Sequence, residues 1–198
     1  MICRSALIRV HPALIKALYK TTFARISADF LPLGSIVSIQ KGKQLNGELL
    51  NESGLYYVMN GGTSPSGYYG SYNMPGGTIS ISEGGNSCGY VQFNDVPFWC
   101  GGHCYTLLPI DTKNVYYKYL YHYLKFQEEV IMSLRIGSGL PNIQKKDIMS
   151  FPVLLPDPDV QIKLCAAFDS IEHKIKIERT VSTILHKQRT YLLKEILI

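Results

Sequence analysis

Three cysteines and one histidine lie close enough along the chain to suggest a metal site or a thiol nucleophile: Cys88, Cys100, His103 and Cys104. Structural zinc takes four sulfur or nitrogen ligands, usually as two closely spaced pairs. The run CGGHC has C-x3-C spacing, and no second pair follows it. Because cysteine is also a common small core residue, we expect these residues to be structural and predict no metal site.

Catalysis by a thiol is disfavoured for a geometric reason. His103 directly precedes Cys104, and adjacent residues on a strand point to opposite faces, so they cannot share a proton directly. The glycine turns at Gly84–Asn86 and Gly137–Gly139 could expose backbone N–H groups to phosphate, but neither matches a nucleotide-binding fingerprint. We therefore expect no catalytic residue, no bound cofactor and no enzymatic activity in this chain.

The central stretch has an unusual polar composition. Residues 44–112 contain no Lys or Arg but many Asn, Gly, Ser and Tyr, and twelve of the fourteen tyrosines lie between residues 56 and 123. Uncharged hydrogen-bonding side chains on a glycine-shaped surface suit the reading of DNA base edges, while flanking cations hold phosphates. The same composition also suits a carbohydrate site or a plain β-rich surface.

Short apolar alternations predict the strands that would carry these residues. Turn residues separate them, and twelve of the seventeen glycines lie between residues 54 and 102. The expected strands lie near residues 36–39, 56–58, 79–81, 91–93, 105–107 and 153–155. After Asn114, apolar residues recur at three- and four-residue spacing, which predicts one amphipathic helix of about four turns that ends near Arg135.

The C-terminal segment predicts a single long helix. Asp157 can cap it, Pro158 fits its first position, and no Pro or Gly follows. Apolar residues form a coiled-coil seam that shifts once along the helix. Because burying each large seam residue stabilises by about 1.5 to 3 kcal/mol, we expect a partner helix from a second copy or another subunit. The alternative is that the helix folds back on its own domain. The seam residues are Leu164, Phe168, Ile171, Ile175, Leu185 and Leu192.

Charge is concentrated at the N-terminus. Residues 1–30 carry a net charge of +4, residues 31–155 a net charge of 0 and residues 156–198 a net charge of +1. Bulk charge therefore does not establish that the central region binds a polyanion. The first thirty residues are either a partly ordered lead-in or a short amphipathic helix. Five irregularly spaced cysteines and the lack of a long apolar run predict a cytoplasmic protein with reduced thiols.

In this order, the segments resemble one known family. The stretches that carry the resemblance are LGSIVSIQKGK (33–43), the glycine-rich string at 56–91, FWCGGHCYTLLP (98–109), GSGLPNIQKKDIMSFPVLLP (137–156) and the helix entered through PDPDVQIKL. Together they resemble the target-recognition domain and conserved helix of the specificity (S) subunit of type I DNA restriction-modification systems. The chain has one domain and one helix, whereas full-length family members have two of each, so it looks like a half-subunit.

The resemblance implies an α+β fold: a lead-in at 1–30, a β-rich target-recognition domain with one or two short helices at 31–156, and a long coiled-coil-forming helix at 157–198. It implies that the chain reads half of a bipartite site on double-stranded DNA and recruits methyltransferase subunits, together with a restriction subunit. A homodimer through the C-terminal helix is expected. The alternative is a β-rich scaffold that binds protein or carbohydrate without reading DNA.

Two groups of residues are expected to contact the DNA. By their position in the family pattern, the phosphate contacts are Lys41, Lys43, Arg135, Lys145 and Lys146. The candidates for base contacts are Asn60, Ser64, Tyr68, Tyr69, Asn73, Glu83 and Asn86. For each candidate base contact, a purely structural role is at least as common as a contact with a base. Tyrosine often fills a core, and asparagine often only makes a turn.

Overall fold

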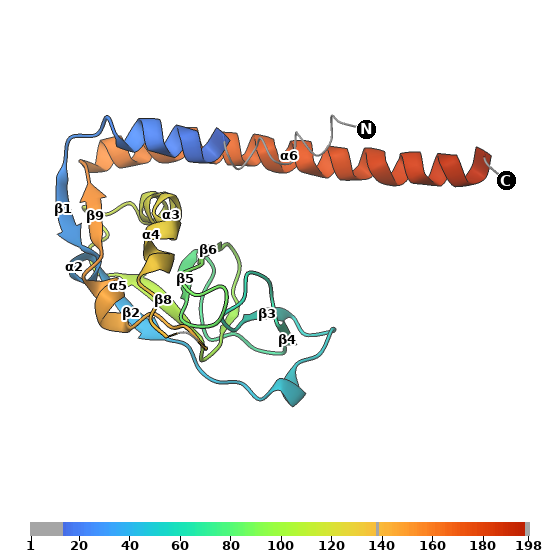
Figure 1. Ribbon diagram of the computed structural model, residues 1–198, viewed down its shortest axis with the longest axis horizontal. Coiled ribbons are helices and arrows are strands. Elements are labelled where there is room, and N and C mark those ends of the chain that lie inside the picture. Colours follow the sequence, from blue (N-terminus) through green and yellow to red (C-terminus); the bar gives the residue numbers. More distant parts are fainter. Residues whose placement is uncertain (1–13, 138, 197–198) are drawn as a thin grey trace. The chain divides into compact units, whose positions relative to one another are not determined.

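The computed structural model describes residues 14–137 and 139–196 (Figure 1). The described residues fall into two compact units. Ser27–Ile162 form the larger unit, and residues 14–26 together with the chain from Lys163 onward form the smaller one. The expected boundaries at 30/31 and 156/157 remain predictions. No helix among the described residues combines the length and the apolar composition needed to cross a bilayer.

A four-stranded antiparallel sheet forms the centre of the larger unit, in the order β2-β8-β5-β6. Its strands are β2 (Val37–Lys41), β8 (Cys104–Pro109), β5 (Thr78–Ser82) and β6 (Val91–Asn94). All five residues of β5 are buried, as expected for a central strand rich in β-branched residues. The register pairs Ile79 with Leu107 and Ile81 with Tyr105.

A second sheet has three strands, in the order β4-β3-β7. Strand β3 (Tyr56–Met59) pairs antiparallel with β4 (Gly67–Tyr69) and parallel with β7 (Trp99–Cys100). Behind it, Met59, Phe98, Cys100 and Cys104 form a buried cluster. A short 3-10 helix, η1 (Gly47–Leu49), lies between β2 and β3. The expected strands of the central region are thus present.

Asn94 links the two sheets through a satisfied polar network. Its Nδ2 donates to Thr78 O at 2.8 Å and to Ser80 Oγ at 3.0 Å, and its Oδ1 accepts from Tyr57 Oη at 2.9 Å. The side chain of Gln92 also donates to this oxygen. Asn94 is only 1% exposed, so these bonds replace those it would make with water.

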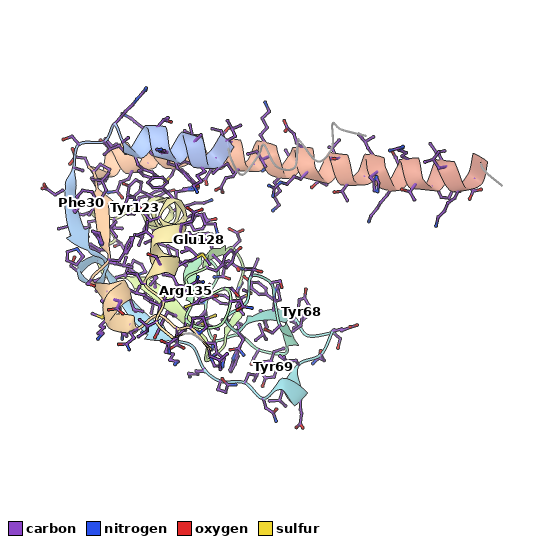
Figure 2. All side chains as sticks on the ribbon, viewed as in Figure 1. Phe30, Tyr68, Tyr69, Tyr123, Glu128 and Arg135 are labelled. Carbon is purple, nitrogen blue, oxygen red and sulfur yellow. The ribbon has the colours of Figure 1, made fainter. Side chains whose placement is uncertain are left out.

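Two helices occupy the region where one helix of about four turns was predicted, so that prediction was wrong in detail. Helix α3 (Tyr117–Phe126) and helix α4 (Glu128–Ser133) are separated at Gln127, which has φ −88° and ψ 7°. At the break, Glu128 Oε2 accepts from Val91 N at 2.9 Å and from Lys125 Nζ at 2.5 Å (Figure 2). A polar anchor to β6 therefore accompanies the end of α3.

The last part of the larger unit brings its two ends together. Helix α5 (Lys145–Met149) leads into β9 (Pro152–Leu155), which pairs antiparallel with β1 (Asp29–Pro32), and the one-turn helix α2 (Leu33–Ile36) follows β1. Helices α2 to α5 outnumber the one or two short helices that were predicted. All of these short helices lie at the edges of the sheets or between strands.

The long helix α6 (Pro158–Ile196) confirms the predicted start and length. Asp157 closes its first turn through its carbonyl oxygen, which accepts from Val160 N and Gln161 N, rather than through the predicted side-chain cap. Gln161 is fully buried, and its Nε2 donates to the carbonyls of Asn114 and Pro156. This side chain fixes the beginning of α6 to the loop before α3.

In the smaller unit, residues 14–23 form a helix that runs antiparallel to α6 (Figure 1). Tyr19 packs edge-on against Phe168 with a ring-centroid distance of 4.7 Å, and Phe23 lies 5.7 Å from the same ring. Tyr19 Oη also donates to Glu172 Oε1 at 2.9 Å. A helical lead-in was one of the two open alternatives, and it is the one observed for residues 14–23; residues 1–13 lie outside the described part of the chain.

Candidate functional site

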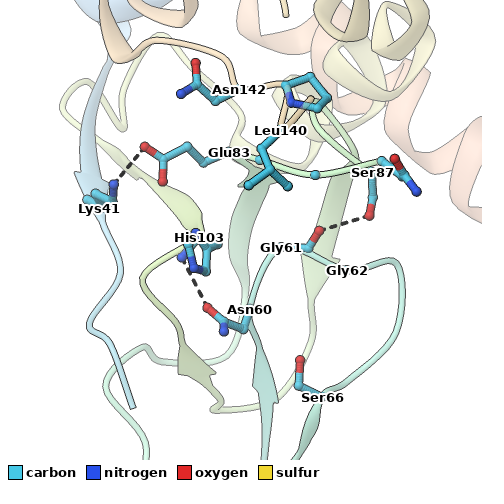
Figure 3. A pocket seen from close by; sticks show the side chains of 14 residues that line it. Lys41, Asn60, Gly61, Gly62, Ser66, Glu83, Ser87, His103, Leu140 and Asn142 are labelled. Atoms are coloured by element: carbon cyan, nitrogen blue, oxygen red, sulfur yellow. Dashed lines mark hydrogen bonds and ion pairs between the residues drawn. The ribbon is translucent and has the colours of Figure 1, made fainter. Parts of the chain in front are cut away.

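A polar groove of about 710 Å³ lies where several turns of the larger unit meet (Figure 3). The end of β2, the β3-β4 and β5-β6 connections, the β7-β8 turn and the loop after α4 all contribute to it. Most of its lining residues are glycines or carry polar side chains. The residues that line it are Lys41, Asn60, Gly61, Gly62, Ser66, Glu83, Gly84, Gly85, Asn86, Ser87, His103, Leu140, Pro141 and Asn142.

Glu83 is the acidic residue of this groove and follows the end of β5. Its Oε1 accepts two hydrogen bonds, from Lys41 Nζ at 2.8 Å and from Tyr105 Oη at 2.8 Å. Burial, together with the hydrogen bond to Glu83, raises the pKa of Tyr105 well above its usual value. The phenol is therefore a donor throughout the physiological pH range, and two donors from different strands hold one oxygen of the carboxylate.

The turn after Glu83 is fixed mainly through its backbone. Gly85 has φ +77°, a conformation that favours glycine, and its N–H donates to Pro141 O at 3.0 Å. Ser87 Oγ donates to Gly61 O at 3.0 Å. The side chain of Asn86, between these anchors, is exposed and has no hydrogen-bond partner among the described residues. Its amide is thus available to a ligand in the groove.

His103 enters the groove from the β7-β8 turn with its backbone held on both sides. Its N–H donates to Asn60 Oδ1 at 3.2 Å, and its carbonyl accepts from Glu83 N at 2.9 Å (Figure 3). The imidazole itself is exposed. Sequence reasoning considered this histidine only as a metal ligand or a base and did not place it among the binding residues. In the sequence, only its position beside the glycine pair at 101–102 could have indicated that His103 lies at a binding groove.

The loop after α4 closes the remaining side of the groove. Ile136 and Asn142 exchange two backbone hydrogen bonds, at 2.9 and 3.0 Å, and Ile143 N donates to Glu83 O at 2.9 Å. Leu140, between these ladder positions, is 87% exposed. Arg135 precedes the loop, and its positive charge opposes the effect of burial, which raises the pKa of Cys88. Arg135 itself is exposed and is not a lining residue of the groove.

The predicted phosphate contacts are all exposed at the surface of the larger unit. Lys41 is tied to Glu83 by the ion pair described above. For the remaining four, Lys43, Arg135, Lys145 and Lys146, no ion pair occurs within the described residues. Lys145 and Lys146 begin α5, directly after the loop that closes the groove. Only Lys41 is a lining residue of the groove; the other cations are candidates for its rim.

The predicted base contacts separate into two groups. Glu83, Asn86 and Asn60 line the groove, whereas Ser64 and Tyr68 are exposed outside it. Tyr69 packs edge-on against Trp99 at 5.2 Å, which gives it a structural role.

Asn73 has a structural role within the domain, and its contact with a base stays a prediction. Its Oδ1 accepts from Cys100 N at 2.7 Å, and its Nδ2 donates to Cys100 O at 3.0 Å. Both ends of the amide are therefore used to hold β7.

The cysteine and histidine cluster makes core contacts. Cys88 Sγ donates to Glu83 O at 2.9 Å, while Cys104 Sγ accepts from Gly61 N at 3.0 Å. A hydrogen bond to Cys104, together with burial, raises the pKa of the Cys100 thiol, so it stays protonated. In the described part of the chain, no three of these cysteine and histidine ligand atoms come close enough to share an ion.

The predicted dimer seam on α6 is divided between covered and exposed residues. Phe168 and Ile175 are buried, and Leu164 and Ile171 are partly buried, whereas Leu185 and Leu192 are 58% and 55% exposed. The chain's own helix at 14–23 covers Phe168 through Tyr19 and Phe23. Within the chain, Phe168 is therefore covered by residues 14–23, and pairing of the seam with a partner helix stays a prediction.

These features define a recognition module: a β-rich domain with a polar groove that continues into a long helix. A family model described as "Type I restriction modification DNA specificity domain" matches residues 28–186. The chain belongs to this family, and the resemblance found from its motifs is confirmed. Family membership does not favour the alternative of a protein- or carbohydrate-binding scaffold.

Similar proteins carry the same description. A protein of Mycoplasma pneumoniae named as a type I specificity subunit is 41% identical over 123 residues, which are 62% of this chain and 32% of that protein. One from Mycoplasma genitalium is 36% identical over 121 residues, 61% of this chain and 31% of the relative. The chain thus spans about a third of the length of these curated relatives.

Solved structures share the fold. The crystal structure of a type I restriction-modification S subunit from M. genitalium matches with a TM-score of 0.77 and 28% identity, covering 84% of this chain and 45% of that one. The HsdS subunit from Thermoanaerobacter tengcongensis matches with a TM-score of 0.63 and 19% identity, over 90% of this chain and 48% of that one, and shows the fold alone. The predicted α+β architecture with a long C-terminal helix is confirmed.

Proposed function

We propose that this chain is a non-catalytic DNA specificity subunit that reads one half of a bipartite sequence and directs type I methyltransferase subunits, together with a restriction subunit, to that site. The observation that carries the proposal is the family match over residues 28–186, which spans both the groove-bearing domain and much of α6. Recognition domain and helix are therefore present in one continuous chain.

The groove supports the proposal through the kind of groups that it holds. Base edges are read by fixed donors and acceptors, and phosphates are held by cations that stand apart from them. Glu83 and Asn86 lie within the groove on anchored turns, while Lys43, Arg135 and the pair at the start of α5 are exposed cations without ion pairs among the described residues. We assign base contacts to the first group and phosphate contacts to the second.

Self-association is the second part of the proposal, and its surface is the end of α6. Apolar side chains there are between 44% and 63% exposed within the chain: Val181, Ile184, Leu185, Tyr191, Leu192 and Leu193. Burying each large apolar side chain stabilises by about 1.5 to 3 kcal/mol. A second copy that packs along this stretch gives two recognition domains in one particle and so supplies both halves of a split site.

A selection from a random duplex library tests the proposal. The full chain, purified with methyltransferase subunits from the same genome, is mixed with the library at fixed salt, and the bound DNA is sequenced. We expect enrichment of a split motif, and methylation of that motif in a host that expresses both proteins. If no motif is enriched at low or moderate salt, the chain is not a sequence-specificity subunit.

A further inference from the structure

The carboxylate of Glu83 has one occupied and one available oxygen. Lys41 and Tyr105 both donate to Oε1, whereas Oε2 receives no hydrogen bond within the described residues. The carboxylate lines the groove beside Lys41 (Figure 3), and the side chain is 14% exposed. A largely buried acceptor is thus held in a fixed orientation with one oxygen left for a ligand.

The backbone around Glu83 makes this orientation rigid. Its N–H donates to His103 O, and its carbonyl accepts from Ile143 N and from the Cys88 thiol, each at 2.9 Å. Main-chain and side-chain atoms are therefore both anchored, to four separate segments of the larger unit. A pre-organised acceptor loses little conformational entropy when a donor binds to it, which favours discrimination between donors and non-donors.

The chemistry of an acceptor-only group restricts which base it can contact. In the major groove, exocyclic amino groups are the donors, and they occur on cytosine and adenine. On adenine the amino group lies beside the N7 acceptor, whose lone pair would face the negative carboxylate. On cytosine the position beside the amino group is a C–H group, which does not repel the carboxylate. Thymine and guanine present acceptors at the equivalent edge.

Resting on the proposed function, we propose that Glu83 is the specificity-determining residue for a cytosine in the recognised half-site, with Oε2 accepting from the cytosine amino group. Lys41 and Tyr105 are positioning residues: they hold Oε1 and keep the carboxylate aimed into the groove. Lys41 therefore acts on base recognition through Glu83, in contrast to the phosphate role predicted from its position in the sequence.

The test compares the wild-type chain with Glu83→Gln in the library selection described above. Glutamine has nearly the same shape but offers both a donor and an acceptor, which is the pairing that adenine prefers. We expect a single C·G position of the motif to lose its preference by roughly 5- to 100-fold and to accept A·T, with the other positions unchanged. Glu52→Gln, at an exposed carboxylate outside the groove, is the matched control and leaves the motif as it is.

A second measurement uses wild-type protein only, so it does not depend on how the variant folds. The selected cytosine is replaced by pyrimidin-2-one, which lacks the amino group, and affinity is expected to fall by a similar factor. An unchanged motif with Glu83→Gln, an unchanged affinity for the modified duplex, or a half-site composed only of A·T pairs overturns the assignment of Glu83 and leaves the proposed function standing. Failure of the wild-type chain to enrich any motif overturns both.

Discussion

Tyr19 and Phe168 pack edge to face at 4.7 Å, so a residue near the beginning of the chain covers the first part of the seam on α6. Around Phe168, side chains of the same chain therefore cover the apolar seam. The exposed apolar stretch begins further along the helix and includes Leu185 and Leu192. The proposed self-association therefore concerns the exposed end of α6 rather than the stretch around Phe168.

Substitution of both exposed seam residues tests self-association. We expect Leu185→Asp together with Leu192→Asp to convert a dimer to monomers, because pairing would bury two like charges on each helix. Sedimentation velocity at micromolar concentration measures the change. Thr183→Asp with Thr190→Asp adds the same charge at the same seven-residue spacing, two positions away along the helix, and is expected to stay dimeric. A wild-type chain that sediments as a monomer contradicts the proposal directly.

The cations at the start of α5 test the phosphate contacts. Lys145→Ala with Lys146→Ala is expected to flatten the slope of log affinity against log salt by roughly 2 units, since each phosphate contact contributes about 0.9. Fluorescence anisotropy with a labelled duplex over a salt series gives the slope. Lys113→Ala, at an exposed lysine outside the groove, serves as the control. Equal slopes for the double variant and the wild type would remove α5 from the interface.

The buried network around Asn94 tests the link between the two sheets. Asn94→Ala deletes both donors and the acceptor used by Tyr57 and leaves several buried polar groups unpaired. We expect the free energy of unfolding to fall by about 3 kcal/mol, measured by urea denaturation. Asn86→Ala, at an exposed asparagine without a partner among the described residues, is expected to change it by no more than about 0.5 kcal/mol. Similar losses for the two variants would contradict the assigned role of Asn94.

Tyr117 gives a pH-dependent prediction. Burial raises its pKa to about 12, and its hydroxyl donates to Leu107 O and accepts from Ile79 N at 3.0 Å. The unfolded chain loses this proton near pH 10, whereas the folded chain retains it. The contribution of Tyr117 to the free energy of unfolding is therefore complete below pH 10 and declines as the pH rises toward 12. We expect the stability difference between wild type and Tyr117→Phe to shrink by up to about 1.4 kcal/mol per pH unit in that window. A difference that is constant from pH 9 to 11.5 would contradict this.

Local patterns were sufficient for much of the fold. Alternating apolar residues located the central strands, and the Asp-Pro pair at 157–158 marked the start of α6, because both signals depend on neighbours in the chain. The division of the predicted helix at Gln127 coincides instead with a long-range hydrogen bond, in which Val91 N donates to the Glu128 carboxylate 37 residues away. No short-range pattern carries that information.

The same distinction applies to the candidate site. Sequence reasoning named Glu83, Asn86 and Lys41, all of which line the groove, because glycine-rich turns with polar residues are a local signal. It also named Asn73, whose amide is used up by Cys100, and it treated Lys41 and Glu83 as independent although they form an ion pair across 42 positions. Which polar side chains remain available depends on tertiary partners that composition does not reveal.

The turns around the groove are anchored by main-chain atoms at Glu83, Gly85 and Ile143, whereas the side chains of Asn86 and Leu140 project from between those anchors. Replacing a projecting side chain leaves the supporting bonds intact, because those bonds do not involve it. Under the proposed function, new target sequences are expected to arise by single substitutions at the tips, with the framework beneath unchanged.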